Sequence, residues 1–256
     1  MMSKDKPQLD SIKSHWEDPA VVSLKDENLR ILEINSIVSG MKKFTSAEKN
    51  FKLADFGCGD GLDTECFSEL AGETFGYDYS TEMLSRASKR TNSRLHFRRL
   101  DLITENITEI FDVAISKRFI INLGDWKIQS RSLSKIADAL KPGGFYFMLE
   151  CFISGLEGIN NHRVRTGLPL LREPFHNSYL DYEQTIDFLS EEFDILDLVD
   201  FSTYYFLTRC VSPILATNDL NLYDTKFRNF SESNDFLQGL GLGPQKLLCL
   251  RKKQKL

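Results

Sequence analysis

The sequence predicts an α/β fold, a seven-stranded, mostly parallel and doubly wound sheet with helices on both faces. A short apolar stretch, residues 51–56, runs into three glycines and then into an amphipathic segment. This is the order of a strand, a tight turn and a helix. Apolar runs of strand length alternate with helix-length segments as far as residue 152, and such alternation is typical of a parallel sheet. The 256 residues suit one domain of this kind with insertions.

The composition narrows the range of partners. A content of 41% hydrophobic and 27% charged residues is ordinary for a globular protein. The net charge of −5 predicts no general attraction to nucleic acid or to an anionic membrane. The five cysteines form no C-x-x-C pair, which favours reduced thiols over disulfides or zinc. The polar N-terminus shows no secretory signal, and the apolar run 145–153 is interrupted by Glu150. We therefore expect a cytoplasmic protein.

The N-terminal part has the pattern of helices in front of the core. Residues 1–10 are polar and predicted to be disordered, whereas apolar positions between Ser14 and Met41 indicate helical segments. Trp16 comes shortly before Pro19, where a helix must break or turn. One interpretation is that Trp16 packs this helix onto the domain.

The glycine turn that follows the first strand predicts a ligand site. Gly57, Gly59 and Gly61 can adopt positive φ, and without a Cβ they let a ligand lie against the backbone. The helix that follows offers free N–H groups at its start. Position 62 is Leu, where a dinucleotide-binding fingerprint has its third glycine. The turn therefore argues against NAD and FAD.

Acidic residues end the second and third predicted strands. The second strand, residues 74–79, reaches Asp78, and a carboxylate at this point of a nucleotide-binding sheet accepts both hydroxyls of a ribose. Ser80 and Thr81 are expected to cap the next helix, residues 82–90. The third strand, residues 95–102, ends on Asp101 and Leu102, and we interpret His96 within it as structural.

The fourth and fifth strands bracket a predicted helix. Residues 111–117 form the fourth strand, whose end, from Ser116 to Phe119, enters the cleft where open parallel sheets bind ligands. Residues 126–140 carry an apolar stripe at helical spacing. The sequence Lys-Pro-Gly-Gly at 141–144 ends this helix and leads into the fifth strand, residues 145–152.

Two of these stretches resemble signatures of the class I S-adenosylmethionine-dependent methyltransferases. Asp55 with the spacing G-x-G-x-G resembles motif I of that family, and Leu140 with the Lys-Pro-Gly-Gly turn and an apolar strand resembles a second signature. The resemblance covers residues 50–152. It implies a seven-stranded sheet whose last strand is antiparallel and lies between strands five and six.

The resemblance also implies S-adenosyl-L-methionine as cofactor. The glycine turn with Cys58 would lie along the amino-acid end of the cofactor, with Asp55 supporting the turn and Ser116 nearby. Asp78 and Tyr79 would hold the ribose, and Asp101 and Leu102 the adenine. N-terminal helices of the superfamily often form a lid, so Trp16 has a second interpretation as a lid residue. The resemblance also leaves room for Arg30 to pair with the cofactor's carboxylate. These assignments together involve Trp16, Arg30, Asp55, Gly57, Cys58, Gly59, Gly61, Asp78, Tyr79, Asp101, Leu102 and Ser116.

The residues at the end of strand four bear on the kind of methyl transfer and on metal binding. Many DNA and protein N-methyltransferases carry an Asn/Asp-Pro-Pro-aromatic motif here, and this chain has Ser-Lys-Arg-Phe instead. Lys117 and Arg118 would repel Mg²⁺, so we expect no metal, and we place both residues on the acceptor side of the cleft.

The long connection after strand five, residues 154–181, is predicted to be an acceptor-binding cap. Long connections in compact domains are usually functional or disordered, and apolar residues in this one favour order. Its arginines suit a phosphate or carboxylate, which predicts a polar, anionic acceptor; a solvated loop is the alternative. An alcohol acceptor must lose a proton, so we expect His176 to act as general base, with His162 second. The other proposed acceptor residues are Asn161, Arg163, Arg165, Arg172, Asn177, Tyr179 and Tyr204.

The cap sequence is also weakly similar to methyltransferases of bacterial surface-polysaccharide gene clusters. The shared pattern, G-L-E-G-I-N-N-H-R, G-L-P and H-N-S-Y, with Tyr-Tyr-Phe-Leu-Thr-Arg at 204–209, favours a sugar, an activated sugar or a phosphorylated glycan precursor. We expect O-methylation of such a small molecule. A nitrogen or carbon acceptor, the related polyamine synthases, and a non-catalytic methyltransferase-like subunit stay open. The sequence does not indicate the oligomeric state.

The C-terminal part completes the predicted sheet. Residues 182–192 are expected to form a helix, 193–201 the sixth strand with Asp197 and Asp200 facing solvent, and 245–251 the last strand. The predicted organisation is a lid (1–48), a cofactor-binding core (49–152), a cap (153–182) and the C-terminal part of the sheet (183–256) with an insertion at 217–240.

Overall fold

Seven strands form one twisted sheet in the order β3-β2-β1-β4-β5-β7-β6. The computed structural model describes residues 9–21, 25–45, 50–215, 224–234 and 236–254. Neighbouring strands from β3 to β5 are parallel, whereas β7 is antiparallel to both β5 and β6. The predicted fold, including the antiparallel last strand, is therefore confirmed. The strands are β1 Lys52–Phe56, β2 Glu73–Asp78, β3 Leu95–Arg99, β4 Phe111–Lys117, β5 Leu140–Cys151, β6 Phe193–Asp200 and β7 Gln245–Lys252.

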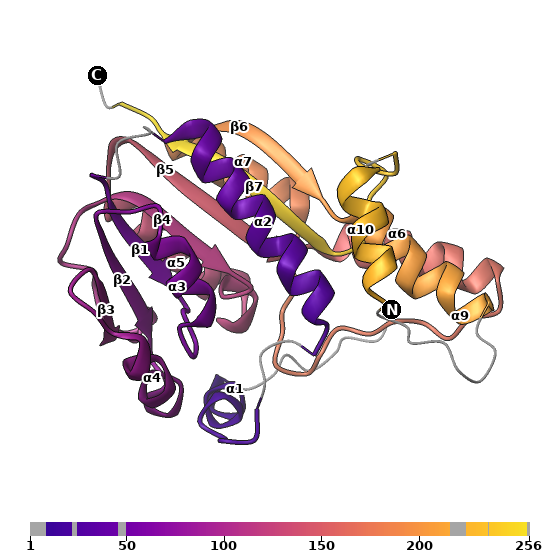
Figure 1. The fold of residues 1–256 in the computed structure, drawn as a ribbon, viewed down its shortest axis with the longest axis horizontal. Helices are drawn as coiled ribbons and strands as arrows, with labels where there is room; N and C mark the ends of the chain where they lie inside the picture. The colour runs from indigo at the N-terminus through magenta and orange to yellow at the C-terminus, as the bar shows by residue number, and fades with distance from the viewer. Residues whose placement is uncertain (1–8, 22–24, 46–49, 216–223, 235, 255–256) are drawn as a thin grey trace.

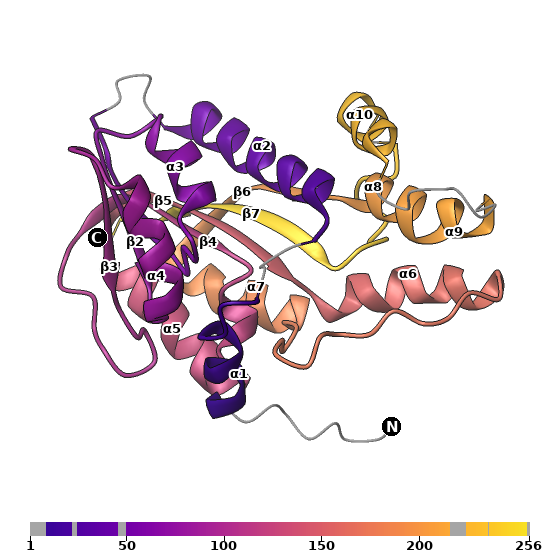
Figure 2. The ribbon, with the colours of Figure 1, turned by 60° about the horizontal axis from the view of Figure 1, so that its bottom comes forward.

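Helices cover both faces of the sheet, with α2 and α3 on one face and α5 and α7 on the other (Figure 1, Figure 2). The helices are α1 Leu9–Trp16, α2 Glu27–Phe44, α3 Leu62–Ser68, α4 Thr81–Ala87, α5 Trp126–Asp138, α6 Ile153–Arg165, α7 Tyr182–Glu192, α8 Ser202–Phe206, α9 Ser212–Leu215 and α10 Thr225–Ser233. Short helical turns are η1 Ser88–Arg90, η2 Ile120–Asn122 and η3 Leu207–Val211.

The central strands are apolar because both of their faces are buried. On β4, Val113 and Ile115 pack against the cluster under α2, while Ala114 packs against the cluster under α5. On β5, Phe147 and Leu149 alternate with Tyr146 and Met148 in the same way. Side chains of a strand alternate between faces, so a strand covered on both sides appears in the sequence as a continuous apolar run.

Among the differences from the sequence prediction, three concern the N-terminus, the fifth strand and the C-terminal insertion. Leu9 and Asp10 already belong to α1, while residues 1–8 of the segment predicted to be disordered lie outside the described residues. The strand β5 begins at Leu140, because Leu140 pairs with Phe111 before the register shifts at the Lys-Pro-Gly-Gly turn. The described part of the 217–240 insertion contains α10.

The prediction that Asp200 faces solvent is wrong. Its side chain is buried, with Oδ1 accepting from the N–H of Ser202 and Oδ2 from the N–H of Gly239 at 2.9 Å. Asp200 thereby ends β6 and holds the chain that returns toward β7. A carboxylate can be buried at such a position because backbone donors replace its water.

The segment after β5 starts as a helix instead of an irregular loop. The helix α6 extends away from the sheet beside η3 and α9 (Figure 2), and the chain then returns in extended form to Leu180, which bridges to Phe152. Among the described residues, no helix combines the length and the apolar character that crossing a membrane would need.

Candidate functional site

A cleft opens at the carboxyl ends of β1, β2 and β4, where open parallel sheets bind ligands. It collects residues from α1, α2, the glycine turn and the loop before α7. The predicted site residues that line it are Trp16, Arg30, Asp55, Gly57, Cys58, Gly59, Asp78, Tyr79, Lys117, Arg118, His176 and Asn177. Twelve predicted residues therefore line one cleft, eight of them assigned to the cofactor and four, Lys117, Arg118, His176 and Asn177, to the acceptor.

The three glycines of the turn have different roles. All three have positive φ, but a Cβ on Gly57 would meet the ring of Phe119 at 2.4 Å and one on Gly61 the ring of Phe97 at 2.5 Å. Around Gly59 no atom lies within 4 Å of the Cβ position. The expectation that all three make room for a ligand is thus corrected, because protein rings fill two of the three spaces. The main chain at Gly59 is open in the manner that a cofactor lying against it needs.

Asp78 presents a fixed carboxylate at the end of β2. Its Oδ2 accepts from the N–H of Gly59 and its Oδ1 from the N–H of Ser80, both at 2.9 Å. Burial raises the pKa of this carboxyl, and the backbone donors oppose that rise. Each oxygen keeps a further lone pair, so the carboxylate fits a ribose diol.

Asp55 lies beneath the glycine turn. Its Oδ2 accepts a hydrogen bond of 2.6 Å from the hydroxyl of Thr64 in α3, which ties the end of β1 to the following helix. Complete burial raises the pKa of Asp55 to about 7. This contact agrees with the expected supporting role.

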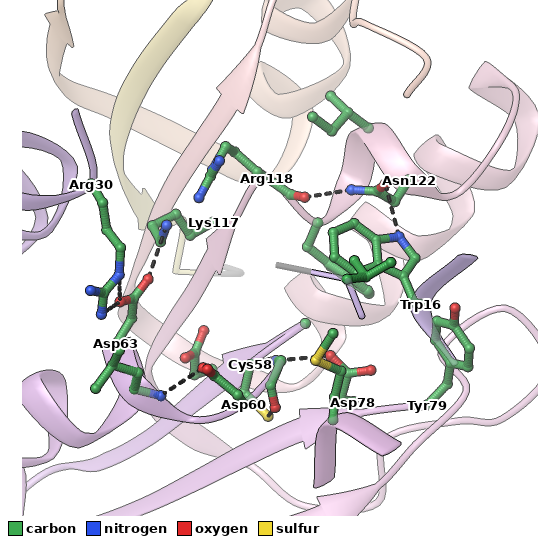
Figure 3. A pocket seen from close by; sticks show the side chains of 18 of the residues that line it. Trp16, Arg30, Cys58, Asp60, Asp63, Asp78, Tyr79, Lys117, Arg118 and Asn122 are labelled. Carbon is green, nitrogen blue, oxygen red and sulfur yellow. Dashed lines mark hydrogen bonds and ion pairs between the residues drawn. The ribbon is translucent and has the colours of Figure 1, made fainter. Parts of the chain in front are cut away.

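A series of ion pairs lies at one side of the cleft, and Figure 3 shows the part formed by Arg30, Asp63 and Lys117. The Nε of Arg30 donates to Oδ1 of Asp63 at 2.7 Å, and the Nζ of Lys117 lies 2.9 Å from Oδ2 of the same carboxylate. Lys117 also pairs with buried Glu33 at 3.2 Å, and Arg118 Nε lies 3.6 Å from Glu33. Although burial opposes it, the charges of Lys117 and Arg30 hold the pKa of Asp63 below its usual value.

The two carboxylates of these ion pairs, Glu33 and Asp63, were not predicted as site residues from the sequence. Glu33 did carry a signal, since it falls on the buried stripe of α2 between Leu29 and Ile37. Asp63 carried a weaker one, as an acid in the first turn of α3. Because of these partners, Arg30 is already paired with a protein carboxylate.

Glu150 fixes the turn that follows β4. Its Oε1 accepts from the N–H groups of Phe119 and Ile120 at 3.1 and 2.9 Å, and its Oε2 from that of Ile121 at 3.4 Å. The group is fully buried, which raises its pKa to about 7 against the effect of these donors. Sequence analysis treated Glu150 only as an interruption of an apolar run, and that interruption was the signal.

Ser116 supports the same turn from within the sheet. It is fully buried, and its hydroxyl lies 2.7 Å from that of Tyr146 and 3.1 Å from Oε1 of Glu150. The structure therefore places Ser116 behind the cleft and not in its lining. The next residue but one, Arg118, has φ of 53°, a left-handed conformation that only a firmly held turn maintains.

The helix α1 lies over the end of the cleft near β2 and β3. The indole N–H of Trp16 donates to Oδ1 of Asn122 at 3.2 Å, and Ser80 Oγ donates to the carbonyl of Trp16 at 2.9 Å. Lys13 Nζ lies 2.5 Å from Oδ2 of Asp101, and the Tyr79 hydroxyl donates to the carbonyl of Lys13. Asp101 thus lies under α1, and both Asp101 and the buried Leu102 lie outside the lining of the cleft.

Opposite α1, the loop before Leu180 brings His176 and Asn177 to the cleft. The N–H of Ser178 donates to the carbonyl of Ile121 at 2.7 Å, and Gln129 Nε2 donates to the carbonyl of Ser178 at 2.8 Å, so the loop is fastened to α5 and η2. Burial, with a smaller effect of His15, lowers the pKa of His176 to about 4. The Nδ1 of His176 and the Oδ1 of Asn177 are buried without a hydrogen-bond partner among the described residues.

The remaining predicted acceptor residues do not reach this cleft. The helix α6 carries Asn161, His162, Arg163 and Arg165 away from the sheet, since 13 residues of α-helix span roughly 20 Å. Arg163 donates instead to the carbonyls of Pro169 and Arg209. The exposed Arg172 and the half-buried Tyr179 also lie outside the lining.

Tyr204 is part of the core. Only 1% of the residue is exposed, and its hydroxyl donates to Oδ1 of Asp26 at 2.7 Å. Asp26 caps α2 and also pairs with Arg209. Tyr204 therefore holds the start of α2 and has no surface to offer to an acceptor.

Comparison with known proteins places these features in context. A family model described as a methyltransferase domain matches residues 54–146, and no curated protein matches the chain. N-methyltransferase NodS from Bradyrhizobium japonicum WM9, solved with S-adenosyl-L-homocysteine, has a TM-score of 0.58 at 13% identity, with 96% of this chain and 98% of that chain covered.

Other solved structures show the same fold. A putative Haloferax volcanii methyltransferase, solved with the activator Trm112, gives a TM-score of 0.57 at 15% identity, covering 98% of this chain and 100% of that chain. An S-adenosylmethionine-dependent methyltransferase from Mesorhizobium loti gives 0.55 at 18% identity, covering 83% and 96%. At these identities the likeness shows the fold.

Proposed function

We propose that the protein transfers a methyl group from S-adenosylmethionine to a hydroxyl group of a small polar, sugar-type acceptor. Phosphorylated and nucleotide-activated sugars are included in that class. The methyltransferase-domain model that residues 54–146 match and the order of the strands in the sheet support this proposal. The observation that carries the proposal is the meeting of two groups of residues in one cleft. Gly59 and Asp78 lie on one side of it, and His176 and Asn177 on the other.

The cofactor half of the proposal rests on the ends of β1 and β2. Asp78 accepts the ribose hydroxyls, and the open main chain at Gly59 lies along the cofactor, with Asp55 supporting the turn. When bound, S-adenosylmethionine supplies a methyl group activated by its positive sulfur. The carboxylates that line the cleft, Asp55, Asp60, Asp63 and Asp78 among them, suit a cationic ligand.

The adenine contact is proposed at Asp101. Lys13 occupies Oδ2 of this carboxylate, Oδ1 accepts from the N–H of Ile103 at 3.2 Å, and the side chain of Thr104 also hydrogen-bonds to the carboxylate. An adenine amino group would therefore share Asp101 with α1. In this arrangement α1 acts as a lid, with Trp16 over the cleft.

On the acceptor side, the protein mainly has to position the nucleophile and exclude water. Trp16, Phe119 and Leu123 provide apolar walls, and His176 and Asn177 provide polar atoms. His176 is proposed as the general base for a hydroxyl. Of the predicted cap, the part that reaches the cleft is the loop that carries these two residues.

A second candidate is an amine acceptor. The pKa of about 4 makes His176 a weak base, and a neutral amine needs no base to attack a methyl group. The similarity of the fold to NodS, which is named an N-methyltransferase, is consistent with this candidate. A non-catalytic subunit is disfavoured because Gly59, Asp55 and Asp78 keep the geometry of a cofactor site.

The test is calorimetric titration of the full-length protein with S-adenosylmethionine and S-adenosylhomocysteine, beside Asp78→Ala. We expect micromolar binding that Asp78→Ala abolishes. Asp197→Ala serves as the matched control, because Asp197 is a carboxylate outside the cleft that pairs with Lys43 on the surface. Absence of binding in a folded protein would overturn the proposal.

A further inference from the structure

We infer that the acceptor is an uncharged polyhydroxy compound, bound through its own hydrogen-bond donors and not through a phosphate or carboxylate group. This inference rests on the proposed methyl transfer and narrows the class of molecule that the same cleft takes.

The first ground is that the cations of the cleft already have carboxylate partners. Its lining contains Arg30, Arg86, Lys117 and Arg118. Arg30 and Lys117 pair with Asp63, Arg118 with Glu33, and Arg86 with Glu82 at 2.9 Å. An anionic acceptor would have to compete with these fixed carboxylates for each cation. The same lining carries further carboxylates, Glu27, Asp60 and Asp78, which repel an anion.

The second ground is the arginine cluster of the cap, which had suggested a phosphate. Arg163 is buried and donates to two backbone carbonyls, while Arg165 and Arg172 are exposed outside the lining. A phosphate in the cleft would therefore find none of the cap's guanidinium groups, and the arginines of the lining are those already paired with carboxylates. Nor does His176 add a positive charge, because burial among His15, Trp16 and Phe175 keeps its imidazole neutral.

The third ground is the character of the buried atoms that lack a partner. Asn177 lines the cleft with a buried Oδ1 that accepts no hydrogen bond from the described residues. The Nδ1 of the neighbouring His176 is also buried without a hydrogen-bond partner among the described residues. A neutral imidazole offers one of its nitrogens as an acceptor. Because a buried acceptor without a donor is unfavourable, these atoms are suited to a ligand that brings hydroxyl groups.

The position of Asn177 is fixed by the fold, which makes it a specificity determinant. The residue after it is anchored at both its N–H and its carbonyl, to Ile121 and Gln129. The amide therefore cannot withdraw from the cleft without breaking two hydrogen bonds.

The first experiment compares matched acceptors in the full-length protein. Methyl pyranosides and the corresponding sugar 1-phosphates and nucleotide sugars are assayed with saturating S-adenosylmethionine. We expect kcat/KM for the uncharged member of a pair to exceed that of its phosphorylated partner by about tenfold or more. A phosphorylated member that is methylated as well as, or better than, its uncharged partner overturns the inference.

The second experiment uses two substitutions of Asn177 that both remove the amide donor, of which only one keeps acceptor oxygens. Asn177→Asp removes the donor of the amide and keeps acceptor oxygens, whereas Asn177→Leu removes both. If the acceptor donates to this residue, KM rises by about tenfold more in Asn177→Leu than in Asn177→Asp. If an anion is bound instead, the aspartate is the worse of the two, and the inference fails.

Cofactor affinity separates this result from a failure of the proposed function. Both variants are titrated with S-adenosylhomocysteine, which does not depend on the acceptor. A wild-type protein that binds neither cofactor form contradicts the proposed function, whereas intact binding with a preference for phosphorylated acceptors contradicts only the inference made here.

Discussion

The imidazole rings of His15 and His176 stack face to face, with centroids 4.4 Å apart and planes inclined by 14°. One ring belongs to α1 and the other to the loop before α7, so the stack joins the two segments that enclose the cleft. Trp16 and Phe175 meet His176 edge-on at 5.4 and 5.2 Å. The two sides of the cleft are thus held together by aromatic contacts around the neutral imidazole of His176.

This contact predicts a pH dependence of stability. The pKa of His176 falls from 6.5 to about 4 on folding, so its contribution is present above pH 6.5 and is lost as the pH falls toward 4. We expect the wild type to lose more unfolding free energy than His176→Phe between pH 7 and pH 5. Urea denaturation of both proteins at pH 7 and pH 5 measures their free energies of unfolding. Equal losses in the two proteins would contradict the prediction.

The same pKa predicts the shape of the rate profile. With His176 as base, His176→Asn should lower kcat by about a hundredfold while the affinity for S-adenosylhomocysteine stays unchanged. The wild-type kcat/KM should not show a break near pH 6.5, because His176 is already deprotonated there. His96→Asn is the control, since His96 packs on Phe75 away from the cleft. Full turnover in His176→Asn would remove His176 from the mechanism.

Replacement by alanine is expected to cause a different defect at each of two glycines in the turn. Gly57→Ala should lower the free energy of unfolding by about 2 kcal/mol, because positive φ and the ring of Phe119 both oppose a Cβ. Gly59→Ala meets no neighbouring atom, so strain alone should cost about 1 kcal/mol. Its larger effect should be on cofactor affinity, which we expect to fall by more than tenfold, or about 1.4 kcal/mol. Calorimetry and urea denaturation of both variants separate the two effects.

Replacing Glu150 is expected to destabilise the protein because its carboxyl group accepts three backbone hydrogen bonds. Glu150→Ala leaves the N–H groups of Phe119, Ile120 and Ile121 without their acceptor, which should cost about 3 kcal/mol or more. Glu150→Gln keeps one carbonyl oxygen and should cost less.

The difference in stability between Glu150→Gln and the wild type is expected to change with pH in one direction. The pKa of Glu150 rises on folding to about 7, so its contribution is greatest below pH 4.5 and declines as the pH rises through 7. We expect the stability of Glu150→Gln relative to wild type to improve from pH 5 to pH 8. A relative decline over this range would show that the carboxylate is favoured in its charged form.

Much of the fold could be predicted from the sequence because it depends on local patterns. The strand Phe111–Lys117 and the helix Tyr182–Glu192 have the predicted bounds, and each is marked by apolar spacing and by clear flanking residues. The residues predicted for the cofactor line one cleft for a similar reason. Gly59 belongs to the turn after β1 and Asp78 ends β2, and in a parallel sheet the ends of such strands meet at one edge.

The acceptor side could not be predicted in the same way because its contacts join distant segments. Arg163 was assigned to an acceptor because it is one of the arginines of the connection 154–181, yet it donates to the carbonyls of Pro169 and Arg209. The stack of His15 on His176 and the pairing of Glu33 with Lys117 also cross large parts of the chain. Only the packing of α1, α2 and α6 decides such contacts, and no local pattern encodes it.

The place of β7 in the sheet has a consequence for how the protein is made. Among the described residues, strand β6 pairs only with β7, and β7 follows all the other strands of the sheet in the sequence. During synthesis, β6 therefore leaves the ribosome before its partner, and one edge of β5 stays open until residues 245–252 have been translated. Unpaired strand edges favour aggregation. A nascent chain stalled before residue 245 should consequently depend on chaperones, although its cofactor-binding residues have all been translated.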